Sequence, residues 1–243
     1  MTSDPLSWLV SLEGVGSAHA AARDGIDVVL RDRGLRRTSP ETTAESLLRG
    51  ARASAVLEGS RSTLAEVRSG AGDAVAQAAL RVSTELLGLA PALRTQPLQA
   101  LARLHALAAR GVLADDELGR PRDAASAARL RSLATVLTSD TSAPALVVAA
   151  LVHADLATVA PFPSHNGIVA RAAERLLLSV RGVDEKSLVV PEAGHLALRA
   201  AYESNLRGYR DGGDAGIHAW LLYAAEAYAA GAEASPLRRA AED

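Results

Sequence analysis

The segment HADLATVAPFPSHNGIVAR, residues 153–171, decides the fold of this chain. Its first half carries Leu, Val and Ala at the three- and four-residue spacing of a helix. Pro161 and Pro163 end that helix, because proline lacks the backbone donor and clashes with the preceding turn. Asn166 and Gly167 tolerate positive φ, so we expect them to turn the chain sharply into a second helix. The segment therefore predicts two helices joined by a tight loop.

The start of the second helix is also a candidate binding feature. The first backbone N–H groups of a helix point outward with the positive end of the helix dipole behind them, which favours an anion-binding nest. An ordinary corner between two packed helices is the alternative interpretation. Phe162 is the only phenylalanine of the chain, and we expect it to anchor the loop in the core.

The rest of the chain repeats the helical pattern. Leu, Val or Ala recur at helical spacing, with Gly or Pro between segments, over residues 43–58, 73–90, 97–110, 123–138, 144–158, 167–181, 193–207 and 217–232. No stretch alternates apolar and polar residues for long enough to indicate a sheet. We therefore predict an all-α bundle of about eight helices with little or no β structure. The predicted divisions are a helical lead-in or linker over 1–45, with a charged stretch at Arg31–Arg37, a helical domain over 46–232 and a polar tail over 233–243.

Composition excludes several classes of protein. Of the 243 residues, 49% are hydrophobic and 22% charged, which is typical of a soluble globular protein and excludes wholesale disorder. Because only 3% are aromatic, the core must consist of closely packed Leu, Val and Ala. The formal net charge of −2 disfavours nucleic acid or an anionic membrane as a partner.

Cysteine usage and targeting signals narrow the possibilities further. The chain has no cysteine, which excludes disulfides and zinc–thiolate sites. The N-terminal residues lack the basic region of a secretory signal, and the longest apolar run, Ala143–Val152, is too short to span a membrane. We therefore expect a soluble, cytoplasmic protein.

Residues 160–171, APFPSHNGIVAR, resemble the signature of the Fic (Fido) domain family, H-P-F-x-[DE]-G-N-[GK]-R-x-x-R. The matching residues are Pro161, Phe162, Asn166, Gly167 and Arg171. Members of that family transfer AMP, or occasionally another phosphate-containing group, from a nucleotide to a hydroxyl of a target protein. The resemblance implies a Fic-like helical domain over 46–232, with ATP and Mg²⁺ as the cofactors of an active member.

A second motif, SAVLEG at residues 54–59, resembles the inhibitory-helix motif [ST]-x-x-x-E-[GN] of the same family. The resemblance implies an inhibitory-type helix near 45–58 that ends at Gly59, and a salt bridge between Glu58 and the last arginine of the signature, Arg171. Ser54, four residues before Glu58, is expected to face the same loop. A solvent-facing Glu58 unrelated to Arg171 is the alternative.

The departures from the signature fall on the residues that perform the chemistry in active relatives. Ala160 stands where the family has the histidine that removes a proton from the target hydroxyl, and loss of such a base alone costs about 10²–10⁴-fold in rate. Ser164 replaces the acidic ligand of Mg²⁺, and His165 replaces a glycine beside the phosphates. Ile168 replaces an arginine that grips the phosphates. These losses compound, because phosphoryl transfer depends mostly on positioning and electrostatic stabilisation.

Three hypotheses for function follow. The leading one is a catalytically degenerate Fic-fold protein, a pseudoenzyme that binds a partner protein, with weak nucleotide or anion binding as a further property. The second is a divergent nucleotidyl- or phosphoryl-transferase that uses His165 as a relocated base. The third is a helical module without a ligand.

The sequence assigns no catalytic residue and no metal ligand. His153 matches a histidine that is structural in similar proteins. The remaining histidines are expected to be packed or surface residues, because no pair has the i, i+4 spacing of a helical metal site; these are His19, His105, His195 and His218.

Overall fold

The computed structural model describes residues 4–32 and 39–239, and within them the regular structure is helical. The elements are α1 (Ser7–Ser11), α2 (Val15–Asp32), α3 (Pro40–Leu57), α4 (Leu64–Ser69), α5 (Ala74–Glu85), the 3₁₀ turn η1 (Leu87–Leu89), α6 (Ala90–Thr95), α7 (Pro97–Ala109), α8 (Ala124–Thr138), α9 (Ala145–Val159), α10 (Asn166–Val180), α11 (Pro191–Ala197), α12 (Arg199–Asp211), α13 (Gly213–Glu233) and α14 (Pro236–Arg239). An isolated bridge between Arg110 and Leu113 is the β feature of the described residues. The all-α prediction is confirmed.

The helices outnumber the eight expected segments for two reasons. Every expected segment is helical, but 73–90 and 193–207 are each divided between consecutive elements. The other additions are α1, α2, α4, α6 and α14, of which only α2 is longer than six residues.

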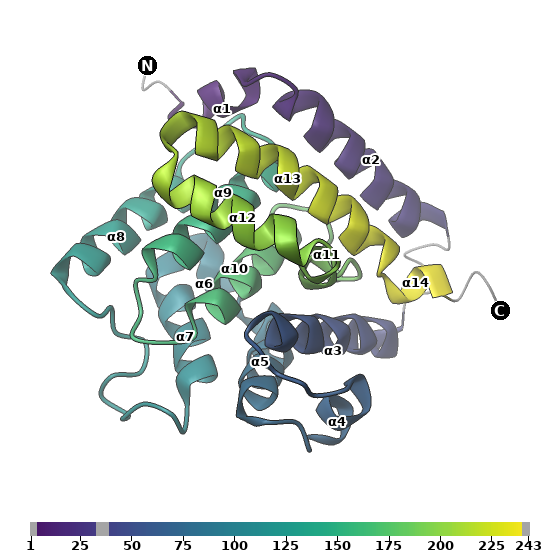
Figure 1. Ribbon diagram of the computed structural model, residues 1–243, viewed down its shortest axis with the longest axis vertical. Coiled ribbons are helices and arrows are strands. Elements are labelled where there is room, and N and C mark those ends of the chain that lie inside the picture. The colour runs from purple at the N-terminus through teal and green to yellow at the C-terminus, as the bar shows by residue number, and fades with distance from the viewer. Residues whose placement is uncertain (1–3, 33–38, 240–243) are drawn as a thin grey trace.

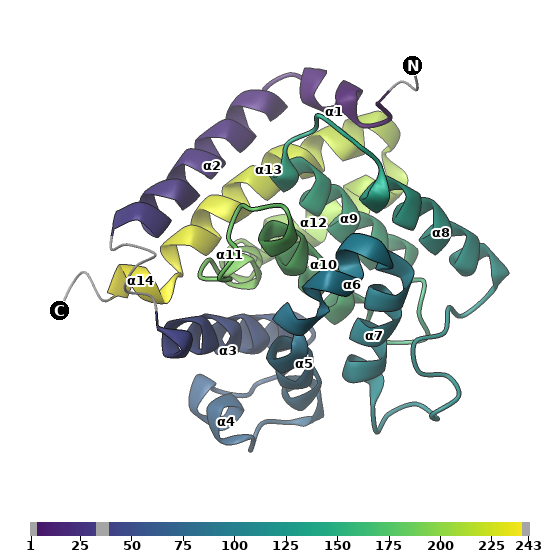
Figure 2. The same ribbon diagram turned by 180° about the vertical axis from the view of Figure 1, so that it is seen from behind.

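The two helices that the segment 153–171 joins, α9 and α10, form the centre of the fold (Figures 1 and 2). Every residue of α10 from Ile168 to Ser179 is buried, and α9 is apolar on nearly all sides, as expected of a helix enclosed by others. On one side the long helices α2 and α13 pack along each other, and on another α3 and α5 form a pair. The outer helices therefore enclose α9 and α10, and buried polar side chains of these two helices can be paired only with each other or with residues of the segments around them.

The lead-in and the tail contain helices of their own. Ala22, Ile26 and Val29 of α2 are buried, and α2 packs on α13. The expected boundary at residue 45 falls inside α3, which begins at Pro40, a favourable first residue of a helix. Residues 33–38 of the charged stretch and residues 240–243 of the expected tail lie outside the described residues. None of the described helices is long and apolar enough to cross a membrane.

Candidate functional site: the signature segment and the polar core behind it

Two residues in the left-handed region form the corner between α9 and α10. Ala160 ends α9 with φ of 47°, and His165 precedes α10 with φ of 55°. The sequence predicts the turn at Asn166 and Gly167, but both already belong to α10. Left-handed φ is uncommon for residues other than glycine, so the surrounding contacts must hold this loop in place.

The side chain of Asn166 closes the loop. Its Oδ1 accepts a hydrogen bond from the N–H of Phe162 at 2.9 Å, and its Nδ2 donates to the carbonyl of the same residue at 2.8 Å. The Phe162 ring is 2% exposed and stacks on His105 at a centroid distance of 4.5 Å. The N–H of Arg122 donates to the carbonyl of Pro161 at 2.9 Å. Asn166 and Phe162 therefore have structural roles in the corner, and Phe162 anchors it as expected.

The remaining loop residues offer little to a phosphate or a metal ion. Ile168 is 2% exposed and packs in the hydrophobic core, away from the loop surface. Ser164 Oγ lies 2.8 Å from His165 Nδ1. Burial lowers the pKa of His165, an effect that Glu58 opposes and Arg81 reinforces. A serine hydroxyl bonded to a neighbouring imidazole does not fit a hard divalent cation such as Mg²⁺, which prefers carboxylates.

Glu58 and Arg171 are in contact. Arg171 Nη2 donates to Glu58 Oε1 at 2.7 Å, and the arginine side chain is 1% exposed whereas that of Glu58 is 34% exposed. Arg171 Nε also donates to Ser54 Oγ at 2.9 Å, and Nη1 donates to Tyr202 Oη at 3.0 Å. Although burial opposes it, Tyr202 and Glu58 raise the pKa of Arg171 above its usual value. The geometry expected for Ser54, Glu58 and Arg171 is thus present.

Two glycines allow this contact. Gly59, with φ of 93°, follows the last turn of α3, and the N–H groups of Gly59 and Ser60 cap the carbonyls of Val56 and Ala55 at 3.0 Å. This cap leaves Glu58 at the helix end. A Cβ on Gly167 would overlap the carboxylate of Glu58, so only glycine lets the carboxylate lie against the first turn of α10. Glu58 therefore lies where the sequence predicts an anion-binding nest.

A second buried arginine attaches α3 to α10 one turn further along. Arg175 is 2% exposed, its Nη2 donates to Ser46 Oγ at 2.7 Å, and its Nη1 donates to Glu192 Oε2 at 3.0 Å. A Cβ on Gly50 would overlap this guanidinium. Ser46, Gly50, Ser54 and Glu58 are spaced by four residues, so one face of α3 is held by the two arginines of α10.

We predict that the Glu58–Arg171 pair is energetically coupled. Glu58→Ala should lower the free energy of unfolding by about 1–3 kcal/mol, because a buried guanidinium loses its carboxylate partner while water can reach it through the gap. Arg171→Met should cost about 3–5 kcal/mol, and the double variant should cost less than the sum. Urea denaturation of the four proteins measures the coupling, and strictly additive costs would contradict it.

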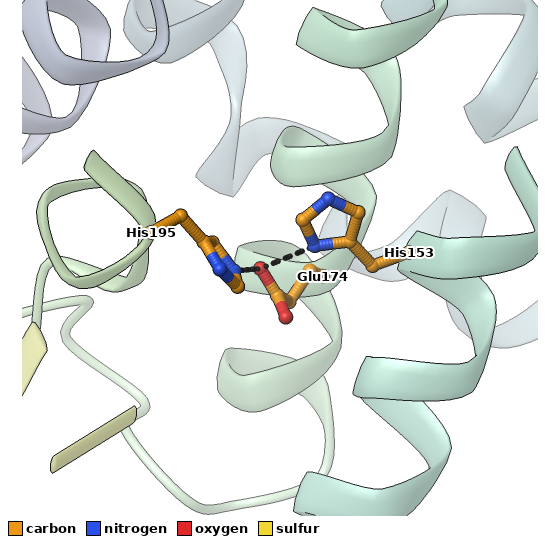
Figure 3. A group of neighbouring side chains, drawn as sticks. All are labelled: His153, Glu174 and His195. Carbon is orange, nitrogen blue, oxygen red and sulfur yellow. Dashed lines mark hydrogen bonds and ion pairs between the residues drawn. The ribbon is translucent and has the colours of Figure 1, made fainter. Parts of the chain in front are cut away.

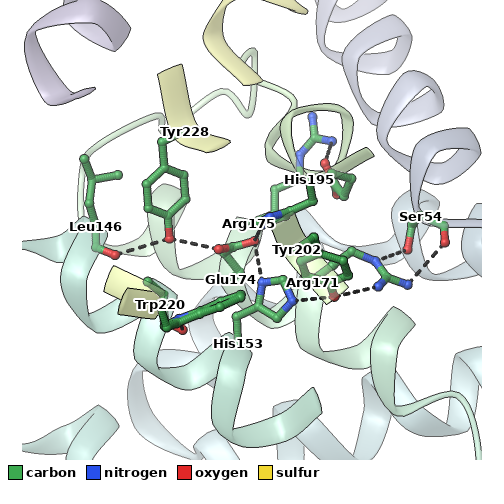
Figure 4. A network of polar contacts seen from close by, with 12 residues as sticks. Ser54, Leu146, His153, Arg171, Glu174, Arg175, His195, Tyr202, Trp220 and Tyr228 are labelled. Atoms are coloured by element: carbon green, nitrogen blue, oxygen red, sulfur yellow. Dashed lines mark hydrogen bonds and ion pairs between the residues drawn. The ribbon is translucent and has the colours of Figure 1, made fainter. Parts of the chain in front are cut away.

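Behind Arg171 lies a buried polar core that the sequence did not indicate (Figures 3 and 4). Glu174 Oε2 accepts a hydrogen bond from His195 Nε2 at 2.9 Å, and His153 Nδ1 lies 2.9 Å from the same oxygen without the alignment of a hydrogen bond. All three side chains are fully buried. The Tyr228 hydroxyl lies 2.9 Å from Glu174 Oε1.

The core continues to the signature segment. His153 Nε2 lies 3.0 Å from Tyr202 Oη, the same oxygen that accepts from Arg171. Since that oxygen accepts from arginine, its own proton serves His153, and we assign the neutral imidazole with the proton on Nδ1. Burial lowers the pKa of His153 to about 4, in agreement with a neutral ring. Although burial opposes it, the two histidines lower the pKa of Glu174, so its carboxyl is ionised.

His153, Glu174 and His195 have donor types that also bind transition metals, and their donor atoms lie within 4.8 Å of one another. However, Glu174 Oε2 already lies between the two ring nitrogens and holds the hydrogen bond from His195. A metal at about 2.0–2.2 Å from each donor would need that oxygen to move away. The hydrogen bonds from His195 and Tyr228 satisfy the carboxylate without a metal ion, so we interpret the cluster as a hydrogen-bonded core.

The fold is that of Fic family proteins, in agreement with the resemblance of the sequence. A crystal structure of a Fic family protein from Desulfovibrio desulfuricans G20 matches with a TM-score of 0.73 and 18% identity, covering 93% of this chain and 74% of that chain. Fic-1 (residues 134–508) from C. elegans matches with a TM-score of 0.69 and 18% identity, covering 98% of this chain and 74% of that chain. No protein-family model and no curated protein matches the sequence.

Proposed function

We propose that this Fic-fold chain is a pseudoenzyme that binds a partner protein and does not transfer nucleotides. The observation that carries the proposal is the residue at the end of α9. Active proteins with the signature that this segment resembles have a histidine base there, and Ala160 supplies a methyl group in left-handed backbone. A methyl group cannot accept the proton of a target hydroxyl.

The phosphate side of the segment supports the same proposal. Ile168 is buried in the core, so no cation extends from that residue toward a nucleotide. The guanidinium of Arg171 is engaged by Ser54, Glu58 and Tyr202. A phosphate at the first turn of α10 would have to displace the Glu58 carboxylate and would meet the side chain of His165. We therefore expect any binding of nucleotide or other anions at this segment to be weak.

The alternative is a divergent transferase with His165 as its base. Ser164 Oγ within 2.8 Å of the imidazole favours this alternative, because a neutral ring in contact with a hydroxyl can accept a proton. Burial lowers the pKa of His165, which keeps the ring neutral at pH 7. This alternative predicts transfer by the wild-type protein and its loss in His165→Gln.

Incubation of purified protein with labelled ATP and cell lysate distinguishes the two proposals. We expect no labelled protein with the wild type or with Glu58→Gly, because removal of Glu58 exposes a segment without base or phosphate clamp. Labelling by either protein, abolished by His165→Gln, would establish the transferase instead.

A restored variant tests whether the fold could still support the chemistry. It carries Glu58→Gly, Ala160→His, Ser164→Asp and His165→Gly; Ile168 is left unchanged because arginine there would be buried. Histidine is among the residues that tolerate left-handed φ, and glycine suits the φ of 55° at residue 165. We expect labelling above that of Glu58→Gly, and matched melting temperatures would exclude unfolding as the cause of a difference.

A further inference from the structure

A pocket lies between α3, the start of α4, α11 and the end of α13, and it includes no residue of the signature segment. Its volume is about 260 Å³. Since a water molecule occupies about 30 Å³ in the liquid, the pocket has room for a small organic molecule. Arg49 and Arg52 contribute charged groups to its lining, and Leu64 and Leu196 contribute apolar surface.

Arg52 has no protein partner in this pocket. Its Nε is buried and makes no hydrogen bond, and none of the described residues accepts a hydrogen bond from its guanidinium or pairs with its charge. A buried donor without an acceptor costs free energy, and in native proteins such a donor commonly meets a ligand, an ion or water. The Arg52 side chain as a whole is half-buried, so the rest of its guanidinium stays open to an acceptor from outside the chain.

The charged groups in and around the pocket also favour a negatively charged ligand. Glu45 is shared between Arg49 at 2.9 Å and Arg68 at 2.8 Å, and Glu233 pairs with Arg238 at 2.7 Å. Although burial opposes it, Arg49 and Arg68 lower the pKa of Glu45, so it is ionised at neutral pH. The charged residues that line the pocket itself are Arg49, Arg52 and Glu233, and this local excess of positive charge favours an anion.

We infer that this pocket binds a small organic anion, with a phosphate or carboxylate group on the guanidinium of Arg52 and an apolar body against Leu64 and Leu196. Guanidinium presents paired N–H donors that match either anionic group in a bidentate contact. The apolar wall gives affinity to the body of such a ligand, which an inorganic ion lacks. The site is separate from the signature segment, so its occupancy does not depend on nucleotide transfer.

Calorimetric titration of the full chain with four probes tests the inference. Phenyl phosphate and benzoate carry both features, inorganic phosphate carries only the anion, and benzyl alcohol carries only the apolar ring. We expect one equivalent of phenyl phosphate or benzoate to bind, whichever has the preferred head group, and the other two probes to bind at least about tenfold more weakly. Failure of both aromatic anions to bind, or equal binding of inorganic phosphate, would overturn the inference.

Three variants test whether the ligand binds in this pocket. Arg52→Gln removes a guanidinium without a protein partner, so the fold should be retained while affinity falls at least about tenfold. Ala193→Met fills the pocket from α11 and should weaken binding by taking up the space of the ligand, without removing a positive charge. Arg103→Gln removes an exposed charge on α7 and is the matched control. Binding that is unchanged by both pocket variants, or lowered equally by the control, would contradict the assignment.

Discussion

Replacing Glu174 by alanine should lower the free energy of unfolding by about 3–5 kcal/mol, measured by urea denaturation near pH 7.5. The carboxylate is fully buried and receives His195 Nε2 and Tyr228 Oη, while His153 Nδ1 lies 2.9 Å away. The substitution leaves His195 Nε2 without its acceptor, leaves Tyr228 Oη only the carbonyl of Leu146 at 3.2 Å, and opens a cavity. The lost acceptor and the cavity both destabilise a closed core.

A matched control distinguishes the loss of the buried hydrogen bonds from the loss of a negative charge alone. Glu226 is an exposed glutamate on α13, and Glu226→Ala should change the free energy of unfolding by no more than about 0.5 kcal/mol. A cost below about 1 kcal/mol for Glu174→Ala would show that water or a neighbouring group replaces the carboxylate, and our description of the core would then be wrong.

The free energy of unfolding should also fall steeply as the pH is lowered from about 6.5 toward 4. Burial lowers the pKa of His19 and of His105 to about 4 in the folded protein, with the charge of His165 contributing at His105. The unfolded chain takes up these protons near pH 6.5, whereas the folded chain does not until about pH 4. Stability is therefore complete above pH 6.5, and each histidine removes up to about 1.4 kcal/mol per pH unit below it.

The hydrogen bonds explain why these two rings resist protonation. His105 Nδ1 accepts the N–H of Gly119 at 2.9 Å, a contact that a protonated nitrogen cannot keep, and its Nε2 is buried without a partner. His19 Nε2 lies 3.0 Å from the carbonyl of Leu221, and its Nδ1 is likewise buried and unpartnered. A second proton on either ring would thus have no acceptor.

Urea denaturation at a series of pH values between 4.5 and 7.5 measures the effect. The double variant His19→Gln, His105→Gln should have a flatter dependence on pH, although it is less stable at pH 7.5. An equal slope in the double variant and the wild type would assign the acid sensitivity to other groups, such as the carboxylates that titrate below pH 5.

The corner between α9 and α10 shows how far local sequence can be interpreted. Proline and the helical spacing of Leu, Val and Ala predicted where α9 ends and α10 begins, because both effects act within a few residues. The sequence predicts left-handed φ angles at Asn166 and Gly167, but Ala160 and His165 adopt them. Asn166 instead uses its side-chain amide to hold both backbone groups of Phe162, and this contact depends on the closed loop.

The sequence by itself determined the helical class, the core of Leu, Val and Ala, and the contact of Glu58 with Arg171, because helical periodicity is local and two motifs resembled one family. Only the tertiary structure brought together His153, Glu174 and His195, which lie on α9, α10 and α11 and are each 21 residues apart in sequence. In the sequence nothing distinguishes them from other polar residues of the same helices, such as Asp155, Arg175 and Glu192. Whether such residues meet depends on the rotation and height at which three helices pack, and those are decided by side-chain contacts along whole helix faces.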